Sequence, residues 1–357
     1  MGDFFLQEGI QNKCPRGASL KFAHPAPSKA RPRILPVFLP LAGCPGRCLF
    51  CAQHAQTGVK TTSLEQALAF LEQNLEAARP DAPLEVGFYG GTFTGLPEAW
   101  MERFLAAARP HRERGAVSGV RCSTRPDRAP AGLLRALAAQ GLDRVELGVQ
   151  TFSEHALRLA QRGHGAEASL AACQAVREAG LGLSLHLLPG LPGHTPEDFS
   201  RDVEQTVALG PEAVRLHPCL VLAGTGLEQL WRAGGYEPWS LERAIAALAP
   251  AVLRFWRAGI AVTRIGLAHE PDLEAAVLAG PTHPALGMRV RALALHRHVE
   301  ELLGGRRADS LRAPASASGG FWGHARELAE PYAGLGLERE RVYFEDRDDF
   351  QLDVQND

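Results

Sequence analysis

Residues 37–53, VFLPLAGCPGRCLFCAQ, join an apolar run to a loop that carries Cys44, Cys48 and Cys51 with the spacing Cys-x3-Cys-x2-Cys. Structural zinc normally takes four Cys or His ligands. No second pair follows at zinc-finger spacing, although His54 lies three residues beyond Cys51. A redox dithiol uses one pair of cysteines and leaves the third unexplained. Three thiolates on one loop favour a cubane iron–sulfur cluster with one open iron, and zinc is the alternative.

Short β-rich runs alternate with longer amphipathic stretches along the chain. Strands are predicted at 33–41, 84–91, 117–124, 144–151, 182–190, 213–221 and 260–268, with helices between them, as at 62–79 and 167–180. Such alternation is typical of βαβ units with a parallel sheet. Six units by about residue 221 are fewer than the eight that close a full barrel. We therefore expect an α/β fold, either a partial (β/α)6 open TIM-like barrel or a doubly wound sheet.

The polar residues of the predicted strands favour the barrel. A strand buried between helices on both faces is almost uniformly apolar, whereas several of these runs alternate polar and apolar side chains. Successive side chains of a strand point to opposite faces, so the polar sets line one surface. These sets are Arg121, Ser123 and Arg125; Glu146, Gly148 and Gln150; Ser184 and His186; and Arg215, His217 and Cys219. An open barrel with a polar lumen explains them, although for any single residue a satisfied buried network is an equal alternative.

The composition is that of an ordinary globular protein. Of the 357 residues 45% are hydrophobic and 22% charged, and the formal net charge is −2, which excludes disorder or coiled coil as a description of the whole chain. No uncharged apolar run reaches the ~18–20 residues that a membrane span needs. No secretory signal is visible at the start. We therefore expect a cytoplasmic protein with no membrane partner.

The sequence divides into a core and smaller extensions. The core barrel is expected over 33–303, after a basic N-terminal extension at 1–32. The stretch 304–320 is rich in Gly, Ala and Ser, has no apolar period, and is interpreted as a linker. The remaining residues, 321–357, are interpreted as a short acidic C-terminal extension whose end is a solvated tail.

The cysteine loop and the motifs that follow it resemble the radical S-adenosylmethionine (SAM) superfamily. CPGRCLFC (44–51) is similar to the cluster signature, and FYGGTF (88–93) to the glycine-rich element after the second strand. The further motifs, in order, are CSTRPD (122–127), RVELGVQT (144–151), QRGH (161–164), LPGLPG (188–193) and LVLAGTGLEQLWRAGGYEPWS (220–240). Over about residues 33–300 the series is similar to the radical SAM half of the Elongator catalytic subunit, a tRNA wobble-uridine modifying enzyme. It resembles oxygen-independent coproporphyrinogen oxidase more loosely.

The resemblance implies two cofactors, a [4Fe–4S] cluster on Cys44, Cys48 and Cys51 and SAM on its open iron. It assigns Phe50 to shielding the cluster from solvent. The positions that it assigns to SAM are Gly90, Gly91, Thr92, Ser123, Gln150, Arg162, His186, Leu188, Pro189 and Gly190. Among these, Arg162 would grip the SAM carboxylate with both guanidinium nitrogens. Leu188 would begin an apolar ledge for adenine.

Residues that act on the substrate are expected on the same face of the strands, beyond SAM. By strand parity these are Arg215 and His217, with Arg264 as a further candidate. Cys219 shares the face and is a candidate hydrogen donor to a product radical, although a buried structural cysteine is the more ordinary interpretation.

The resemblance implies an enzyme that cleaves SAM reductively at the cluster and abstracts hydrogen with a 5′-deoxyadenosyl radical, supplied with electrons by a flavodoxin or ferredoxin. The implied substrate is RNA, in particular tRNA. Since only residues 304–357 follow the barrel, the acetyltransferase half of the Elongator subunit is not expected here. The alternatives are a radical SAM enzyme that acts on a small molecule and a non-catalytic iron–sulfur or RNA-binding protein.

Cations upstream of the first strand are candidates for an arm that holds RNA phosphates, with a solvated basic leader as an equal alternative. They are Lys13, Arg16, Lys21, Lys29, Arg31 and Arg33.

Overall fold

The computed structural model describes residues 19–27, 33–53, 55, 63–267 and 271–355. The chain divides into a barrel unit, Ala26–Val290, and a terminal unit that combines Met1–Pro25 with Arg291–Asp357. Helix α11, Leu286–Leu303, begins in the barrel unit and ends in the terminal unit. The two ends of the chain therefore belong together, whereas the sequence analysis treats them as separate extensions.

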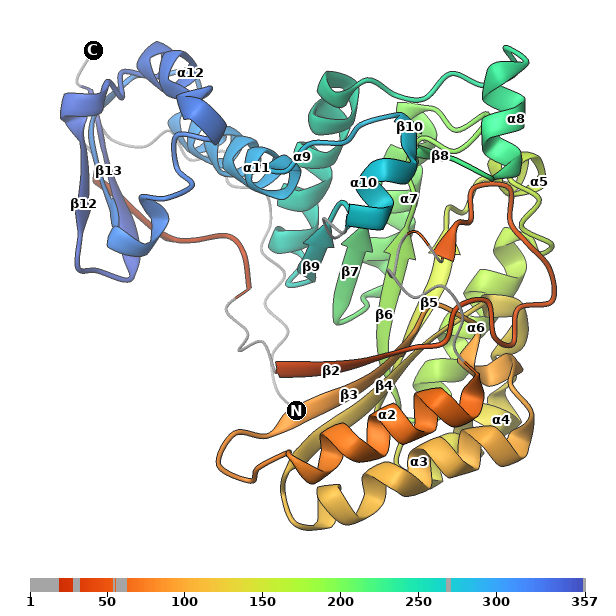
Figure 1. The fold of residues 1–357 in the computed structure, drawn as a ribbon. Coiled ribbons are helices and arrows are strands. Elements are labelled where there is room, and N and C mark those ends of the chain that lie inside the picture. Colours follow the sequence, from red (N-terminus) through yellow and green to blue (C-terminus); the bar gives the residue numbers. More distant parts are fainter. Residues whose placement is uncertain (1–18, 28–32, 54, 56–62, 268–270, 356–357) are drawn as a thin grey trace, which may run out of the picture. The chain divides into compact units, whose positions relative to one another are not determined.

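The barrel unit is built on a parallel seven-stranded sheet in the order β2-β3-β4-β5-β6-β7-β9 (Figure 1). Its strands are β2 Arg33–Phe38, β3 Leu84–Tyr89, β4 Val117–Thr124, β5 Arg144–Gln150, β6 Gly182–Leu187, β7 Ala213–Leu216 and β9 Ala261–Ile265. Every neighbouring pair is parallel. The sheet curls into a half-barrel, and the carboxyl ends of all these strands lie along one edge.

Helices cover the outer face of the curved sheet (Figure 1). The longer ones are α2 Leu64–Glu76, α3 Glu98–Glu113, α4 Ala131–Ala139, α6 Ala166–Glu178, α7 Pro196–Leu209 and α9 Leu241–Arg257. The ends of α7 follow from its sequence: Thr195 and Asp198 form a capping box around Pro196, and Gly210 ends the helix with a φ of 52°. Shorter elements are α5 Glu154–Leu159, α8 Gly226–Arg232, α10 Pro271–Ala276, and the antiparallel pair β8 Val221–Leu222 and β10 Val277–Ala279.

The predicted alternation of strands and helices is confirmed. The helices expected at 62–79 and 167–180 are α2 and α6, and the seventh predicted run, 260–268, supplies β9 at the edge of the same sheet. Of the two architectures left open, the partial barrel of α/β class is the correct one.

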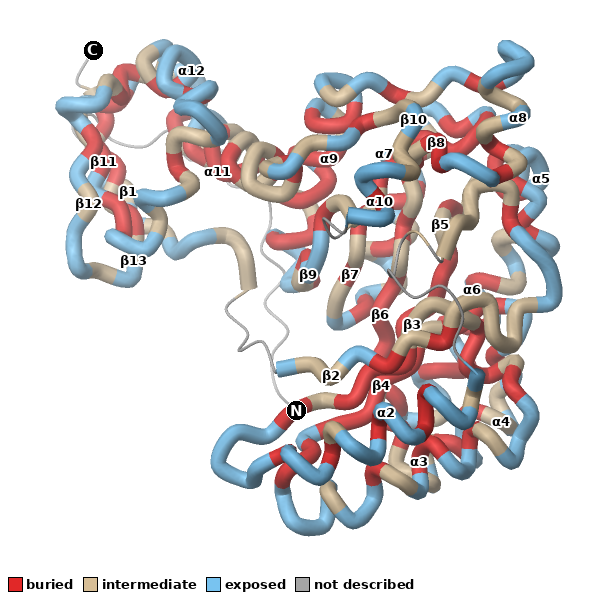
Figure 2. Tube along the Cα trace, in the orientation of Figure 1, coloured by how far each residue is buried: buried red, intermediate tan, exposed pale blue. Residues whose placement is uncertain are grey.

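The terminal unit holds a four-stranded sheet in the order β1-β13-β11-β12. Its elements are β1 Ser19–Ala23, β11 Ala308–Pro314, α12 Ala329–Gly334, β12 Val342–Glu345 and β13 Asp349–Val354. β1 pairs antiparallel with β13, which joins the two ends of the chain. A core that includes Phe321, Tyr332 and Phe350 packs against this sheet, and Figure 2 shows it as buried segments.

The interpretation of 304–320 as a linker is wrong, because β11 lies inside it. Its buried residues are Ala308, Leu311, Ala313 and Pro314, of which only Leu311 is a large aliphatic residue, so the run carries little apolar signal in the sequence. The acidic end is not a solvated tail either. Phe350, Leu352 and Val354 are buried and alternate with polar residues along β13, a period of two that the acidic composition hides.

The proposed cationic arm is only partly within the described residues. Lys21 lies in β1 and Arg33 begins β2. The other four cations, Lys13, Arg16, Lys29 and Arg31, lie outside the described residues.

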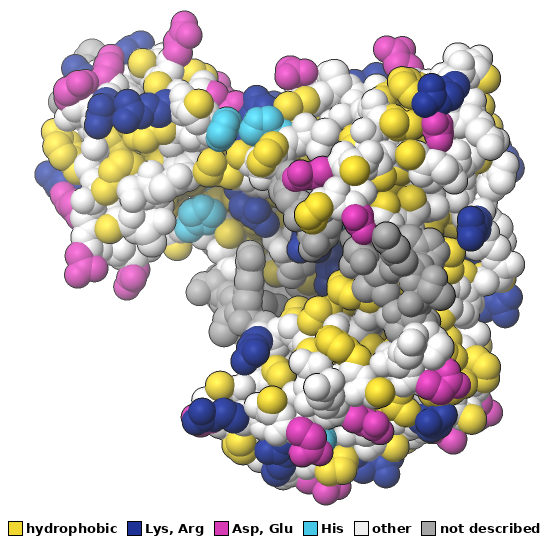
Figure 3. Space-filling view, viewed as in Figure 1, with side chains coloured by type: hydrophobic (Ala, Val, Ile, Leu, Met, Phe, Trp, Pro, Cys, Tyr) yellow, Lys and Arg dark blue, Asp and Glu magenta, His cyan; other side chains and the backbone are white. Residues whose placement is uncertain are grey.

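The surface carries charges of both signs. On the face shown in Figure 3, Lys and Arg side chains are interspersed with Asp and Glu, in keeping with the net charge of −2. Among the helices that the structure describes, all are too short or too polar to cross a membrane.

Phe350→Ala should destabilise the terminal unit by about 3–5 kcal/mol, because it leaves a cavity where a fully buried ring stacks on Phe22 at 4.9 Å. Hydrogen exchange of the β11 and β13 amides measures this locally. Gln351→Ala, on the other face of the same strand, is the matched control and should cost below about 0.5 kcal/mol. Equal effects of the two variants would mean that this end of the chain is not packed.

Candidate active site

A cavity of about 260 Å³ opens at the carboxyl ends of the barrel strands, and we call it the strand-end cavity. Most of the residues that the sequence analysis assigns to the cofactors or the substrate line it: Cys44, Cys48, Phe50, Cys51, Gly90, Gly91, Thr92, Ser123, Gln150, Arg162, His186, Leu188, Arg215 and His217. Arg264 and Cys219 line it too. Pro189 and Gly190 are buried and do not line it. Residues from all seven strands of the sheet, or from the segments that follow them, thus meet in one place, because parallel strands bring their carboxyl ends to one edge.

The cysteine loop is held against the end of β3. The Thr92 amide donates to the Ala42 carbonyl at 2.8 Å, and the Cys44 amide donates to the Leu41 carbonyl at 3.1 Å. Thr92 Oγ1 lies 3.2 Å from Cys44 Sγ. A Cβ at Gly91 would collide with the carbonyl oxygens of Leu39 and Ala42, so only glycine permits this approach. The glycine-rich element therefore supports the cysteine loop as well as lining the cavity.

Cys48 lies beside two buried guanidinium groups. Arg162 Nη1 is 3.2 Å from Cys48 Sγ, and Arg125 Nη1 is 3.5 Å from it. Arg125 also donates to the Arg162 carbonyl at 2.6 Å and forms a two-bond pair with Asp127 at 2.9 and 3.0 Å. Donors and positive charge directed at a sulfur suit a thiolate ligand of an anionic metal cluster.

The three thiols face the same cavity. Burial, reinforced by Cys48 and Cys44, raises the pKa of the Cys51 thiol to about 12. A metal that binds here must therefore displace the Cys51 proton. Within the described ranges no three His, Cys, Asp or Glu side chains are arranged to hold a metal ion as they stand. His54 lies outside those ranges.

Two polar atoms at the positions assigned to SAM are buried without a hydrogen-bond partner in the described protein. They are Ser123 Oγ and Arg162 Nε. Buried polar atoms are almost always paired, so each is a place where a ligand can supply a partner. The Nη atoms of Arg162 are already engaged, Nη1 with Cys48 and Nη2 with the Gly148 carbonyl at 2.5 Å. The expected grip of both Nη atoms on a carboxylate is therefore not what this structure shows.

Two residues of the cavity wall adopt a left-handed backbone without being glycine. Gln150 has a φ of 70° at the end of β5, where the pairing with β6 shifts register, and Leu41 has a φ of 60° in the cysteine loop. Such a conformation costs about 1–3 kcal/mol and is commonest where function constrains the backbone. The Gln150 carbonyl accepts from the Leu188 amide at 2.7 Å, which ties the strained residue to the next strand.

The segment after Leu188 is fixed by hydrogen bonds from its backbone to the side chains of Tyr236 and His194. The Gly190 carbonyl accepts from the Tyr236 hydroxyl at 2.6 Å, and the Gly190 amide donates to His194 Nδ1 at 3.1 Å. His194 Nε2 in turn lies 3.1 Å from Asp202. Gly190 has a φ of 86°, which glycine adopts at no steric cost. Pro189 and Gly190 are therefore buried beneath the cavity wall and fix the position of Leu188, which lines the cavity.

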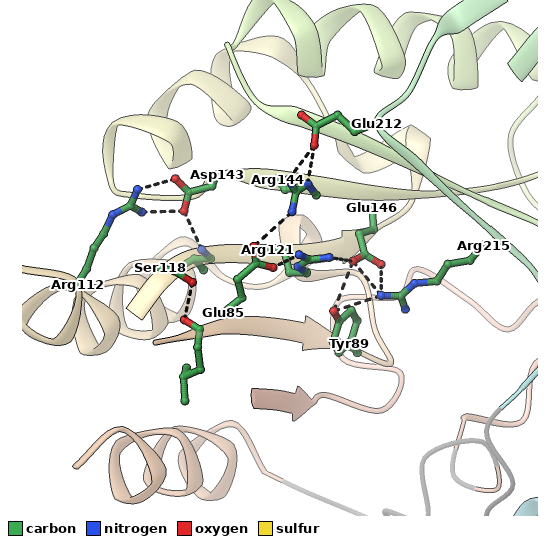
Figure 4. A network of polar contacts seen from close by, with 12 residues as sticks. Glu85, Tyr89, Arg112, Ser118, Arg121, Asp143, Arg144, Glu146, Glu212 and Arg215 are labelled. Carbon is green, nitrogen blue, oxygen red and sulfur yellow. Dashed lines mark hydrogen bonds and ion pairs between the residues drawn. The ribbon is translucent and has the colours of Figure 1, made fainter. Parts of the chain in front are cut away.

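A buried carboxylate, Glu146 on β5, lies at the centre of a polar network that includes the cavity-lining Tyr89, His186 and Arg215 (Figure 4). His186 Nε2 lies 2.8 Å from Glu146 Oε2, and Arg215 Nη2 lies 2.9 Å from it. Arg121 Nη1 is 3.2 Å and the Tyr89 hydroxyl 3.4 Å from Oε1. Arg121 and Arg144 extend the network to Glu85, and Arg144 reaches Glu212 at 2.7 Å.

In this network the negative charge of Glu146 is compensated by the positive charges of Arg121 and Arg215. Burial alone would raise the pKa of Glu146, but the hydrogen bond from His186 and the positive charges of Arg215 and Arg121 lower it to about 2. Burial lowers the pKa of His186 and raises that of Tyr89. Glu146 is therefore ionised, and His186 is neutral and donates its Nε2 proton.

His217 and Cys219 lie in the segment that follows β7. His217 Nδ1 lies 3.1 Å from the Gly266 carbonyl, so it carries the proton and Nε2 is an acceptor. Burial, with His186, Arg215 and Arg264 nearby, lowers the pKa of His217 to about 3. Burial raises the pKa of Cys219 to about 12. Cys219 packs in an apolar cluster with Leu191 and Val221, which fits its interpretation as a structural cysteine.

Sequence reasoning did not assign a role to three residues of the site. Tyr89 stands inside FYGGTF and Arg125 inside CSTRPD, so both motifs contained the signal. Glu146 was recognised only as a member of a polar face. The pairing that makes it central comes from strands distant in sequence.

The sequence of this chain is similar to two family models and to several known proteins. Residues 38–205 match the model of the Radical SAM superfamily, and residues 211–294 match the Radical_SAM C-terminal domain. The chain is 28% identical over 256 residues to a tRNA uridine(34) acetyltransferase of Methanocaldococcus infernus, covering 60% of this chain and 48% of that protein. It is 31% identical over 259 residues to Elongator complex protein 3 of Mus musculus, covering 59% and 47%.

The chain thus spans about half the length of the curated relatives it matches. Among solved structures, the archaeal Methanocaldococcus infernus Elp3 with an N-terminal deletion shares the fold with a TM-score of 0.58 and 24% identity. The match covers 76% of this chain and 63% of that one.

Glu146→Gln should destabilise the barrel unit by about 3 kcal/mol at pH 7. The pKa of Glu146 is about 2 in the folded protein and 4.5 for an ordinary glutamate, and each pKa unit of this difference corresponds to about 1.4 kcal/mol of folding free energy. The depressed pKa means that this stability is present above pH 4.5 and is lost as the pH falls toward 2. The difference between wild type and variant in urea unfolding should therefore narrow below pH 4.5. A difference that stays constant down to pH 3 would show that the charge of Glu146 is not what stabilises the fold.

Proposed function

Because this chain belongs to the radical SAM superfamily, we propose that it is the enzyme that cleaves SAM at a [4Fe–4S] cluster on Cys44, Cys48 and Cys51 and modifies RNA. The observation that carries the proposal is the cavity itself. All three thiols line it, and the Cys48 sulfur is contacted by two buried guanidinium groups. Structural zinc would call for a fourth Cys or His ligand.

When bound, the cluster and SAM would supply one-electron reductive cleavage of SAM and hydrogen abstraction from the substrate, with a flavodoxin or ferredoxin as electron donor. The chain's own residues hold and orient these groups. Gly91 lets the cysteine loop approach β3, and Arg125 and Arg162 direct donors at Cys48.

Ser123 Oγ and Arg162 Nε are the polar atoms best placed to meet SAM, because both are buried and unpaired in the described protein. Gln150 and Thr92 line the same cavity, with Leu188 as an apolar wall. Phe50 lines it next to Cys51 and excludes water from that side.

Arg215 and His217 are proposed to meet the substrate beyond SAM. Arg215 is fixed by Glu146, and neutral His217 offers an acceptor at Nε2. The relatives are named tRNA uridine(34) acetyltransferase, which supports tRNA as the substrate. The net charge of −2 and the interspersed surface charges favour the second candidate, a small-molecule substrate.

Cys44→Ala, Cys48→Ala and Cys51→Ala should each abolish iron binding. The reason is that each sulfur is proposed to be a ligand of the same cluster. Wild-type protein purified without oxygen should hold about four irons per chain, the content of one [4Fe–4S] cluster. Iron and sulfide analysis measures this. Cys173→Ala, a buried cysteine of α6 outside the cavity, is the matched control and should keep its iron. Stoichiometric zinc without iron would refute the cluster.

Ser123→Ala should raise the dissociation constant of SAM about fivefold, since one neutral hydrogen bond is worth about 1 kcal/mol. Anaerobic calorimetry of the iron-loaded protein measures it. Ser118→Ala, on the same strand but bonded to the Leu84 carbonyl, should bind SAM like wild type. If both variants match wild type, Ser123 does not contact SAM.

The function itself is tested with dithionite, SAM and bulk tRNA under nitrogen. We expect 5′-deoxyadenosine and a mass change in a tRNA nucleoside, both detected by mass spectrometry. Arg215→Ala should lower the yield of modified nucleoside more than it lowers 5′-deoxyadenosine, because Arg215 is proposed to contact the substrate and not SAM. Turnover with a small-molecule extract but not with RNA would favour the second candidate. Absence of 5′-deoxyadenosine would favour a non-catalytic protein.

A further inference from the structure

Part of the cysteine loop faces solvent instead of the strand-end cavity. Pro45 and Arg47 are exposed and do not line the cavity. Pro45 directly follows Cys44, and Arg47 directly precedes Cys48. Since neighbouring Cα atoms are about 3.8 Å apart, this surface lies one residue away from two of the proposed cluster ligands. A protein too large to enter a cavity of about 260 Å³ can therefore come close to the cluster from this side.

Helices α5 and α8 flank this part of the loop (Figure 1). The Leu49 amide donates to the carbonyl of Ala160, the residue after α5, at 3.1 Å. The Leu49 carbonyl accepts from the Leu227 amide of α8 at 2.8 Å. The loop, the end of α5 and α8 therefore adjoin one another at the surface. We call their exposed and half-buried residues the outer loop patch: Pro45, Arg47, Leu49, Arg158, Leu159 and Trp231.

The outer loop patch carries two exposed cations. Neither Arg47 nor Arg158 makes an ion pair through its guanidinium with any residue that the structure describes. The carboxylates of the flanking helices are engaged: Glu228 of α8 pairs with Arg232 at 2.8 Å, and Glu154 at the start of α5 accepts from the first amide of α6 at 2.6 Å. The patch is therefore locally positive, although the net charge of the chain is −2.

Apolar side chains complete the patch. Leu159 is 44% exposed, which is unusual for a large hydrophobic residue in this protein. Leu49 and Trp231 are half-buried and pack on the same apolar cluster, and the Arg232 guanidinium lies 5.6 Å from the centre of the Trp231 ring. Exposed apolar side chains bordered by charged ones mark surfaces where another protein docks. Arginine and aromatic side chains are enriched in such interfaces.

From these features we propose that the outer loop patch docks an acidic protein that carries one electron. The reduced carrier gives up one electron and the cluster on the three cysteines gains it, with no bond made or broken. The proposal rests on the proposed function for its cluster, and it deepens that function by naming the surface where the electron donor binds. A positive patch attracts an acidic partner and speeds their encounter.

The small size of the patch suits an electron carrier better than a nucleic acid. Interfaces between electron-transfer partners are among the smallest specific ones, because the partners separate after each transfer. Binding of a nucleic acid depends on the neutralisation of many phosphates, and Arg47 and Arg158 are only two cations. If charge reversal at these two positions weakened tRNA binding and left carrier binding unchanged, the patch would belong to RNA and the inference would be wrong.

Binding is measured by anaerobic calorimetry of the iron-loaded full chain with a flavodoxin and, separately, with a [2Fe–2S] ferredoxin, both acidic. We expect a complex with at least one of them that weakens as salt is added, and none with a cytochrome c, a basic carrier. Arg47→Glu and Arg158→Glu should each raise the dissociation constant about tenfold.

Arg109→Glu is the matched control, an exposed arginine in the second half of α3, and should bind within about twofold of wild type. Since α3 leads into β4, this half of the helix lies toward the amino ends of the strands, away from the cysteine loop. Failure of both acidic carriers to bind, or equal binding by all three variants, would overturn the inference.

Two reductants separate docking from chemistry. With dithionite, a small molecule that needs no docking surface, Arg158→Glu should form 5′-deoxyadenosine from SAM within about twofold of wild type. With the reduced carrier at limiting concentration, the same variant should be about tenfold slower, because fewer complexes form. Equal loss with both reductants would show that Arg158 supports the fold or the cluster instead, and would overturn the inference. Absence of 5′-deoxyadenosine from wild-type protein with dithionite would overturn the proposed function itself.

Discussion

Glu146 is a carboxylate buried at the centre of the half-barrel, and its contacts come from four other strands. Tyr89 of β3, Arg121 of β4, His186 of β6 and Arg215 of β7 all reach it. An unpaired charge at this depth would cost several kcal/mol. The sheet must therefore bring these strands into one register, and the register in turn allows a polar lumen inside an apolar shell of helices.

The same register fixes the cysteine loop. Parallel pairing of β2 and β3 puts Phe38 opposite Tyr89, and the chain then turns at Leu41 and packs on Gly91. The loop is held by backbone contacts, so its sulfurs can face the cavity with little support from neighbouring side chains. Two of the sulfurs do have side-chain contacts: Thr92 Oγ1 lies beside Cys44 Sγ, and Arg125 and Arg162 contact Cys48.

Two arginines of the strand-end cavity are paired with carboxylates of the same unit. Of the arginines that line the strand-end cavity, Arg125 is paired with Asp127 and Arg215 with Glu146. Arg264 lines the same cavity from the last strand of the sheet. The guanidinium groups of Arg125 and Arg215 are therefore held in fixed places at the strand ends.

The sequence by itself determined the α/β alternation, the half-barrel and the cysteine loop, because each rests on local periodicity or on spacing within one segment. Strand parity also placed Ser123, His186 and Arg215 on a common face. The terminal sheet was missed, since β11 and β13 become strands only by pairing with each other and with β1. Only the tertiary structure decided that Glu146 is the shared partner of four strands and that α5 and α8 flank the cysteine loop. Those features depend on contacts between residues far apart in the chain, which local patterns do not encode.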